Sequence, residues 1–219
     1  MSRPPVDPIA ADDDPSLTAP GDLATAVGGS RQTIDLALFE LLAATRRTSL
    51  RVDVGRGVPI ELIERLCRVA MWAPNHKKSW PWRFAVATGD GRSRLGATMA
   101  AALERAGVND EARLEKFRQK YLRAPAILVV GSTPGDSEFR TLENRDAVSA
   151  GIQNLLLGAT AAGLASFWSS GAPPADPAVA ELFGWETGTA TLGIVYLGWP
   201  NGEVSVPLRP ELDLQLLTE

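Results

Sequence analysis

A chain of 219 residues can bury roughly 70% of its unfolded surface in one core, so it needs no disulfide framework. One cysteine and one histidine cannot supply the three or four Cys/His ligands of a usual zinc site. The 22 basic and 26 acidic side chains give a net charge of −4, which argues against a general nucleic-acid binder. No apolar run approaches the roughly 20 residues of a membrane span, and the acidic N-terminus lacks the features of a signal peptide. We therefore expect a cytoplasmic chain without metal, nucleic-acid or membrane partners, which binds a small molecule or a second copy of itself.

The first part of the chain divides into an irregular arm and two helices. Residues 1–31 are rich in proline, contain three consecutive aspartates and show little apolar periodicity, which predicts a disordered arm. The rest, residues 32–219, is expected to form a single domain. Apolar residues recur at helical spacing in residues 33–45, and Pro59 begins a second helix that Pro74 ends.

Four short strands are expected further along. Alternating or continuous apolar residues bounded by proline and glycine indicate them at residues 82–87, 126–132, 165–170 and 191–199. Two helices separate the first two strands, a long helix follows at about residues 139–162, and a short one covers residues 177–184. The expected fold is α+β, with helices around a mostly antiparallel or mixed central sheet. From Asn201 the tail is expected to be extended and is too apolar to be free, so we expect it to pack on a partner subunit.

Three arginines and two hydroxyl groups lie within six residues just after the first helix. These residues are Arg46, Arg47, Thr48, Ser49 and Arg51. Guanidinium groups bind phosphate oxygens in pairs and hydroxyls add short hydrogen bonds, so the cluster is chemically sufficient for a phosphate site. Arginines after a helix also cap its carbonyls and complement its dipole, and this structural interpretation stays open.

A proline-bounded loop, residues 73–82, presents His76 together with two lysines, a serine and a tryptophan. Loops held between rigid elements often carry function, and a histidine can act as a general acid, a base or a hydrogen-bond donor. No nucleophile stands beside His76 in the sequence, so no catalytic triad is indicated. An ordinary polar role for His76 stays open.

Residues 89–96 read GDGRSRLG between an expected strand and an expected helix, which is the context of a dinucleotide-binding loop. The glycine spacing is G-x-G-x-x-x-x-G rather than G-x-G-x-x-G, and no βαβ unit with a suitably spaced acidic residue is evident. We therefore expect a plain turn. A small NAD(P)-binding dehydrogenase that uses this segment is the alternative.

Five segments follow one another in the order RRTSLR, VPIELIERLCRVAMWAPNHKKSWPWRF, APAILVVGS, SAGIQNLLLGATAAGLASFWSSG and LGIVYLGWP. In this order and spacing they resemble the nitroreductase family of flavoproteins, and most closely its short, single-domain NAD(P)H nitroreductases. The resemblance covers nearly everything from Thr33 to Arg209. It implies a homodimer of α+β subunits, with one FMN at each of two sites along the dimer interface and NAD(P)H as co-substrate.

The resemblance also implies roles for single residues. The positions that match the family's FMN contacts are Arg46, Arg47, Thr48, Trp72, His76, Trp168, Ser169, Ser170 and Arg209. The first three would hold the phosphate and ribityl chain, the next two would reach the flavin from the partner subunit, and the three residues from Trp168 on would line the ring system. The positions that match a nicotinamide-binding stretch are Gly158, Ala159, Thr160, Ala161, Ala162 and Gly163. Ser169 stands where close relatives tend to have arginine.

The function that this resemblance implies is an FMN-dependent oxidoreductase. Hydride would pass from NAD(P)H through FMN to a small organic acceptor of the nitroaromatic, quinone or enone type, by a ping-pong mechanism. No protein nucleophile is then needed, since the flavin carries the chemistry and the protein positions it. Two alternatives stay open: a flavin-binding storage or sensor protein without turnover, and a flavoenzyme of the same fold that removes halide or cleaves the flavin.

Overall fold

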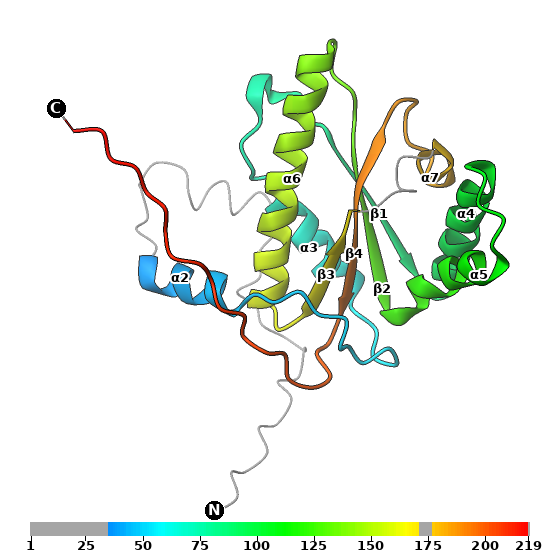
Figure 1. Cartoon of the computed structure of the whole chain (residues 1–219), viewed down its shortest axis with the longest axis horizontal. Helices are drawn as coiled ribbons and strands as arrows, with labels where there is room; N and C mark the ends of the chain where they lie inside the picture. The colour runs from blue at the N-terminus through cyan, green and yellow to red at the C-terminus, as the bar shows by residue number, and fades with distance from the viewer. Residues whose placement is uncertain (1–34, 171–176, 219) are drawn as a thin grey trace, which may run out of the picture. The chain divides into compact units, whose positions relative to one another are not determined.

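The computed structural model describes residues 35–170 and 177–218 (Figure 1). The chain separates into two units, Met1–Phe39 and Glu40–Glu219, and the first is described only from residue 35 on. The predicted arm of residues 1–31 lies outside the described residues. No described helix combines the length and the apolar character that a membrane span requires.

Helices and strands alternate along the chain. The α-helices are α2 (Leu36–Thr45), α3 (Ile60–Ala70), α4 (Gly91–Arg105), α5 (Glu111–Lys120), α6 (Glu138–Ala161) and α7 (Pro177–Leu182). The 3₁₀ turns are η1 (His76–Lys78) and η2 (Tyr121–Arg123), and the strands are β1 (Trp82–Thr88), β2 (Ala126–Ser132), β3 (Ala165–Ser169) and β4 (Ala190–Gly198). The four predicted strands and the predicted long helix are confirmed. The short last helix ends at Leu182, two residues before the predicted Gly184, which has a left-handed φ of +66°.

The four strands form one antiparallel sheet in the order β1-β2-β4-β3. All of β2 is buried, because it is a central strand with helices on both faces. Since β1 and β2 run antiparallel, α4 between them is not the crossover of a parallel βαβ unit. The glycines of residues 89–96 serve the turn and the packing instead: Gly89 has a φ of +49°, and a Cβ on Gly96 would lie 2.2 Å from the carbonyl oxygen of Arg118.

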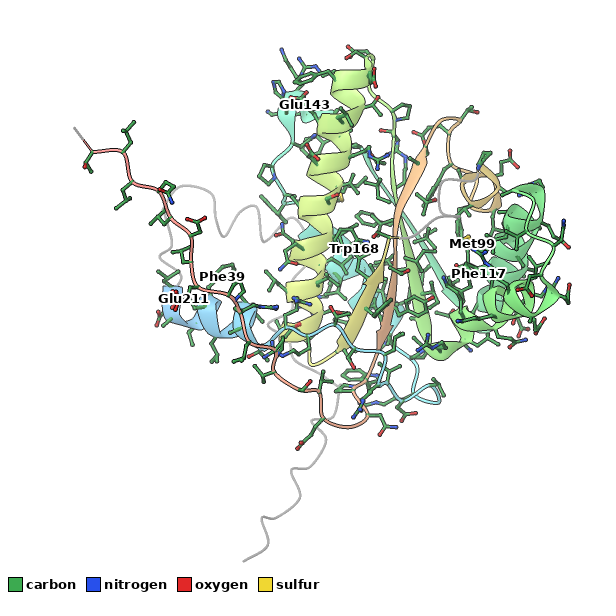
Figure 2. The ribbon with its side chains drawn as sticks, in the orientation of Figure 1. Phe39, Met99, Phe117, Glu143, Trp168 and Glu211 are labelled. Atoms are coloured by element: carbon green, nitrogen blue, oxygen red, sulfur yellow. The ribbon has the colours of Figure 1, made fainter. Side chains whose placement is uncertain are left out.

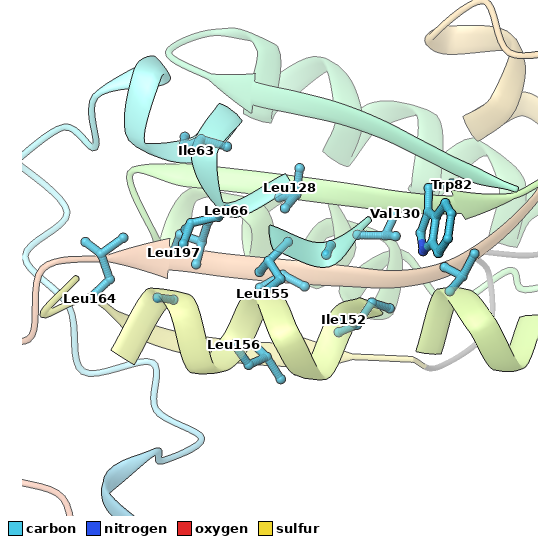
Figure 3. Close-up of a cluster of buried hydrophobic side chains, with 14 of the residues drawn as sticks. Ile63, Leu66, Trp82, Leu128, Val130, Ile152, Leu155, Leu156, Leu164 and Leu197 are labelled. Atoms are coloured by element: carbon cyan, nitrogen blue, oxygen red, sulfur yellow. The ribbon is translucent and has the colours of Figure 1, made fainter. Parts of the chain in front are cut away.

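The sheet lies between two layers of helices (Figure 1). α3 and α6 cover one face, where Leu128, Leu155 and Leu197 are fully buried (Figure 3). α4, α7 and η2 cover the other face, where Met99 and Tyr121 are buried. Burying one such side chain contributes about 1.5–3 kcal/mol. The hydrophobic core on both faces therefore holds the sheet in place. Helix α6 runs along one of these faces, and the candidate site residues lie near its two ends.

The start of α5 offers a test of helix capping. The Asp110 side chain accepts the N–H of Arg113 at 3.2 Å, whereas Asp90, at the start of α4, makes no side-chain cap. We expect Asp110→Ala to lower the free energy of unfolding by about 1 kcal/mol, because a helical N–H loses its acceptor. Asp90→Ala is the matched control and should change stability little. Urea unfolding of both variants measures the difference, and equal losses would contradict the capping role.

Apolar side chains are exposed on α2 and on the C-terminal tail. The periodicity of residues 33–45 predicts one buried helical face, but α2 has no buried residue in the structure. After β4 the tail is extended without regular structure, and Val206 and Leu208 are exposed. None of the described residues covers these side chains, so the described part of the chain does not provide the surface on which the tail is predicted to pack.

Candidate functional site

The segment after α2 pairs with the outer edge of β3. Thr48 forms an isolated parallel bridge with Ser166, and Ser49 donates its backbone N–H to the Ser166 carbonyl at 2.9 Å. Because β3 is an edge strand of the sheet, its outer side is free to make this contact. The structure therefore brings the arginine segment and the predicted ring-contacting residues of β3 to one sheet edge, although they are far apart in the sequence.

The three arginines of this segment have different partners. Arg47 donates from Nη1 to two carbonyls at the end of α2, so it caps that helix, as the structural interpretation of the sequence expected. Arg51 donates to the Glu203 carbonyl at 2.9 Å and holds the start of the tail. Arg46 reaches the Thr48 hydroxyl at the long distance of 3.5 Å. Arg46 is therefore the arginine of this segment that is not held by a carbonyl, and with the Thr48 hydroxyl it is the best candidate pair for binding an anion.

Trp168 does not turn its ring toward this edge. Its indole packs over Gly193 of β4, where a Cβ would lie 2.1 Å from Nε1, and Nε1 is buried without a hydrogen-bond partner. Figure 2 shows Trp168 beside α6. Ser166 directs its carbonyl outward, and because this direction alternates along a strand, Trp168 directs its backbone N–H and carbonyl outward as well. A ligand at this edge would thus meet the backbone of Trp168 rather than its indole.

The remaining residues predicted near the ring continue from β3. Ser169 is half-buried at the end of the strand, and Ser170 is exposed just after it. Arg209 lies in the exposed tail and makes no hydrogen bond or ion pair with the part of the chain that the structure describes. The sheet edge therefore gathers the serines and the arginine segment, and the predicted role of Arg209 stays a prediction.

Residues 158–163 form the C-terminal turn of α6. The first glycine packs against Leu66 of α3, because a Cβ there would lie 3.0 Å from Leu66 Cδ2. Gly163 has a left-handed φ of +74°, and Leu164 donates its N–H to the Ala159 carbonyl at 2.8 Å, which is the bonding pattern that ends many helices. These contacts give both glycines structural roles, and the predicted nicotinamide contact stays a prediction.

Strained backbone is concentrated in the loop that precedes β1. Lys77, Lys78 and Trp80 have φ values of +59°, +53° and +50°, and among the described residues they are the non-glycine positions with positive φ. Such conformations cost about 1–3 kcal/mol each and persist where the surroundings hold them, often at ligand sites. The loop is therefore a candidate binding element.

A chain of hydrogen bonds holds this loop in place. Asn75 accepts the backbone N–H of Trp80 at 2.9 Å and donates to the Ser79 hydroxyl at 3.0 Å. The same hydroxyl donates to Oδ1 of Asn144 at 2.6 Å. Asn144, on α6, is only 5% exposed and donates to the Thr133 carbonyl at 3.2 Å. The strained loop is thus tied to α6 and to the residue that follows β2.

His76, Glu143 and Arg140 form a cluster next to this network. His76 Nδ1 lies 2.8 Å from Glu143 Oε1 and 2.7 Å from Arg140 Nη1, and Arg140 Nη1 donates to Glu143 Oε2 at 2.5 Å. The bonds from His76 and from Arg140 hold the pKa of Glu143 below its ordinary value. The cluster lines a pocket of about 450 Å³, to which Lys77 and Asp136 also contribute.

The Glu143 carboxyl is expected to titrate below the ordinary value of 4.5, because its charged form accepts bonds that its neutral form would lose. Its contribution to stability is therefore present above the ordinary pKa and is lost as the pH falls through the lowered one. Replacing His76 or Arg140 by alanine should in each case raise the Glu143 pKa, because each change removes a hydrogen bond that the charged carboxyl accepts. Carboxyl ¹³C NMR measures both shifts, and a wild-type pKa at or above 4.5 would contradict the geometry.

The His76 cluster and the β3 edge lie at opposite ends of α6. This helix has 24 residues and is about 36 Å long at 1.5 Å per residue. His76 contacts it near its N-terminal end, at Glu143 (Figure 2), whereas Thr48 bridges to β3, which begins after its C-terminal end. Trp72, 60% exposed, follows α3. Within one chain, the residues predicted to hold the phosphate therefore lie beside the residues predicted to line the ring. His76 of the same chain lies far from the phosphate residues.

Sequence reasoning missed Arg140, Glu143 and Asn144 as site residues. A signal for Asn144 exists, because it lies at helical spacing from the buried Val148 and Ile152, and a polar side chain on a buried stripe requires a partner. Arg140 and Glu143 are three residues apart on one helix, which in sequence is indistinguishable from a surface ion pair.

Other chemistry in the described chain is limited. Cys67 lines a pocket between α3 and β1, and burial raises the pKa of its thiol to about 12, which keeps the thiol protonated and unreactive at neutral pH. Among the residues that the structure describes, no group of three His, Cys, Asp or Glu side chains could hold a metal ion.

Comparisons with known proteins identify the family of the chain. The model of the family described as "Nitroreductase family" matches residues 43–199. The "Putative NAD(P)H nitroreductase YdjA" of Escherichia coli (strain K12) is 32% identical over 150 residues, which is 68% of this chain and 81% of that protein.

Solved structures give the same fold. A nitroreductase-like family protein from Bacillus cereus is 25% identical with a TM-score of 0.69, over 84% of this chain and 95% of the other. The FMN-dependent nitroreductase NfnB from Mycobacterium smegmatis, solved in complex with NADPH, is 20% identical with a TM-score of 0.63, over 80% of this chain and 96% of the other. The α+β fold predicted from the sequence is confirmed, and the chain belongs to the nitroreductase family.

Proposed function

We propose that the chain is an FMN-dependent oxidoreductase that passes reducing equivalents from NAD(P)H to a small organic acceptor of the nitroaromatic, quinone or enone type. The observation that carries the proposal is the bridge between Thr48 and Ser166, which joins the residues proposed for the phosphate to the outer edge of β3. The names of similar proteins support this cofactor and this reductant, since one is an FMN-dependent nitroreductase solved with NADPH and another is named as an NAD(P)H nitroreductase. When bound, FMN supplies the hydride chemistry, and the protein supplies position and electrostatics.

The donor set at one end of this edge suits a phosphate group. The Arg46 guanidinium is fixed in charge and can offer two parallel N–H groups, and the Thr48 hydroxyl lies within reach of it. Arg47 uses Nη1 for two carbonyls at the end of α2, which holds its guanidinium at the helix end. Arg46 and Thr48 would therefore hold the phosphate, and Arg47 would keep the segment in its position.

The other end of the edge suits a flat heteroaromatic ring. Trp168 turns its backbone N–H and carbonyl outward, and two serines follow it. One donor and one acceptor side by side match the alternating N–H and C=O groups of a flavin pyrimidine edge. The indole of Trp168, packed on Gly193, would fix the strand that carries these groups.

A second copy of the chain would complete the site. FMN is shorter than the distance of about 27 Å that α6 spans from Glu143 to Ala161, so one molecule cannot reach both Thr48 and His76 of one chain. We infer that Trp72 and His76 act from the partner subunit of a homodimer. Exposed apolar side chains on the helix surfaces and the tail support such an interface. They include Leu41, Met71, Trp72, Val206, Leu208 and Leu212.

Steady-state oxidation of NADH and NADPH with an added quinone, under anaerobic conditions, tests the proposed activity. The FMN-loaded protein should consume one of the two reductants in proportion to the quinone reduced. FMN bound at full occupancy without any oxidation would favour the storage or sensor alternative and contradict the proposal.

Mixed dimers test the shared site. One variant carries Arg46→Ala with Thr48→Ala, and the other carries Trp72→Ala with His76→Ala, so that neither homodimer should retain FMN. A heterodimer purified by two different tags has one site with all four changes and one with none. It should bind one FMN per dimer, whereas no binding would show that all contacts come from the same chain.

A further inference from the structure

Nδ1 of the His76 imidazole has two neighbours, one of which requires a proton on this nitrogen and the other a lone pair. Glu143 Oε1, at 2.8 Å, is a pure acceptor while ionised and requires a proton on Nδ1. Arg140 Nη1, at 2.7 Å, is a pure donor and requires a lone pair there. Both demands cannot be met at once. The neighbour with the stronger hold on Nδ1 therefore decides which ring nitrogen carries the proton when the imidazole is neutral.

The geometry favours the carboxylate. Arg140 has a second acceptor in Glu143 Oε2, at 2.5 Å, and a guanidinium has five N–H groups to place. Glu143 is held ionised at neutral pH, since its pKa is lowered. The carboxylate can therefore accept from His76 with one oxygen and from Arg140 with the other. This arrangement satisfies all three groups and puts the His76 proton on Nδ1.

The opposite ring nitrogen is then the functional one. His76 belongs to a loop whose strained backbone is tied to Asn144, the neighbour of Glu143 on α6. The His76 side chain is 55% exposed and lines the pocket of about 450 Å³. Among the described residues Nε2 has no hydrogen-bond partner. In the neutral tautomer with the proton on Nδ1, Nε2 is a hydrogen-bond acceptor open to a ligand.

We propose that Glu143 is a positioning residue that keeps the His76 proton on Nδ1, so that Nε2 accepts a hydrogen bond from a hydroxyl or N–H group of the bound cofactor. This inference rests on the proposed function for the identity of the ligand, since FMN carries both ribityl hydroxyls and a ring N–H. Arg140 restrains the carboxylate and does not itself set the tautomer. Losing Glu143 would let Arg140 donate to Nδ1, which would move the proton to Nε2 and turn the acceptor into a donor.

The single histidine of the chain makes the tautomer directly measurable. Long-range ¹H–¹⁵N NMR of the flavin-free protein, at a pH at which the ring is neutral, distinguishes a protonated Nδ1 from a protonated Nε2. The wild type and Arg140→Ala should both carry the proton on Nδ1, and Glu143→Ala should carry it on Nε2. A proton on Nε2 in the wild type, or no change in Glu143→Ala, would overturn the proposal.

FMN titration followed by flavin fluorescence gives the second readout. Glu143→Ala should weaken FMN binding by about tenfold. The hydrogen bond to Nε2 would be lost, and the protonated Nε2 would face a hydrogen-bond donor of FMN. Arg140→Ala removes the same ion pair within α6 but leaves the bond to His76, so it should weaken binding by less than about fivefold, roughly the limit for an exposed pair. Equal losses in the two variants would assign Glu143 a merely structural role and overturn the proposal.

Two further controls separate the possible failures. Glu115→Ala breaks a comparable pair with Arg118 on α5, far from the loop, and should leave both the tautomer and the FMN affinity unchanged. If the wild type binds no FMN, the proposed function fails, while the tautomer measurement still decides whether Glu143 positions His76.

Discussion

Replacing Arg46 by alanine is expected to weaken FMN binding by about 10- to 100-fold, because a guanidinium that pairs with a phosphate contributes charge-assisted hydrogen bonds of about 1.5–3 kcal/mol. Arg46 is the candidate because its contact with Thr48 is long, whereas Arg47 is engaged with helix carbonyls. Equilibrium titration of flavin-free protein with FMN measures the loss.

Two control variants sharpen this result. Arg113→Ala removes one positive charge from the exposed face of α5 and should leave FMN affinity unchanged, which separates a local contact from a change in net charge. Riboflavin, which lacks the phosphate, should bind the wild type and Arg46→Ala about equally. If Arg46→Ala weakens riboflavin as much as FMN, the residue does not bind the phosphate.

The second large effect is expected from Gly151→Ala, at the contact between α3 and α6. A Cβ at this position would lie 2.8 Å from the Ala70 carbonyl oxygen and 2.7 Å from Trp82 Nε1, so backbone or a buried ring would have to move. Overpacking of this kind costs about 1–3 kcal/mol. Because two close contacts are made at once, we expect this cost to exceed the gain of up to about 1 kcal/mol that alanine brings to a helix, for a net loss of about 1–2 kcal/mol in urea unfolding.

Gly91→Ala is the matched control for this variant. Gly91 is also helical, but a Cβ there would meet only Ala87 Cβ, at the ordinary distance of 3.8 Å, so stability should stay the same or rise slightly. A Gly151→Ala protein as stable as the wild type would show that α3 and α6 can separate without loss.

Local patterns in the sequence predict the elements but not their partners. The apolar run of β2 predicts a buried strand, and the structure confirms it, because a continuous run requires cover on both faces. The strand order, with β4 between β2 and β3, depends on long-range pairing that no local pattern encodes. The bridge from Thr48 to Ser166, which assembles the candidate site, also depends on long-range pairing and could not be predicted from a local pattern.

The roles of single site residues were also only partly predictable. Three arginines in one segment indicate an anion site, but which of them caps the helix depends on where α2 ends. The family resemblance implies that Trp168 lines the flavin ring, and its indole is turned inward because Gly193 on the neighbouring strand leaves space for it. Glu143 gains its importance from His76, 67 residues away in the sequence, so no local signal could have indicated it.

The visible absorption spectrum of the purified protein tests directly whether the chain binds FMN. The flavin released by heat should be identified by chromatography beside an FMN standard and quantified against the protein. We expect a yellow protein that releases FMN at close to one molecule per chain. A colourless protein that also takes up no added FMN would contradict this expectation, and would leave Arg46, Thr48 and the edge of β3 with structural roles alone.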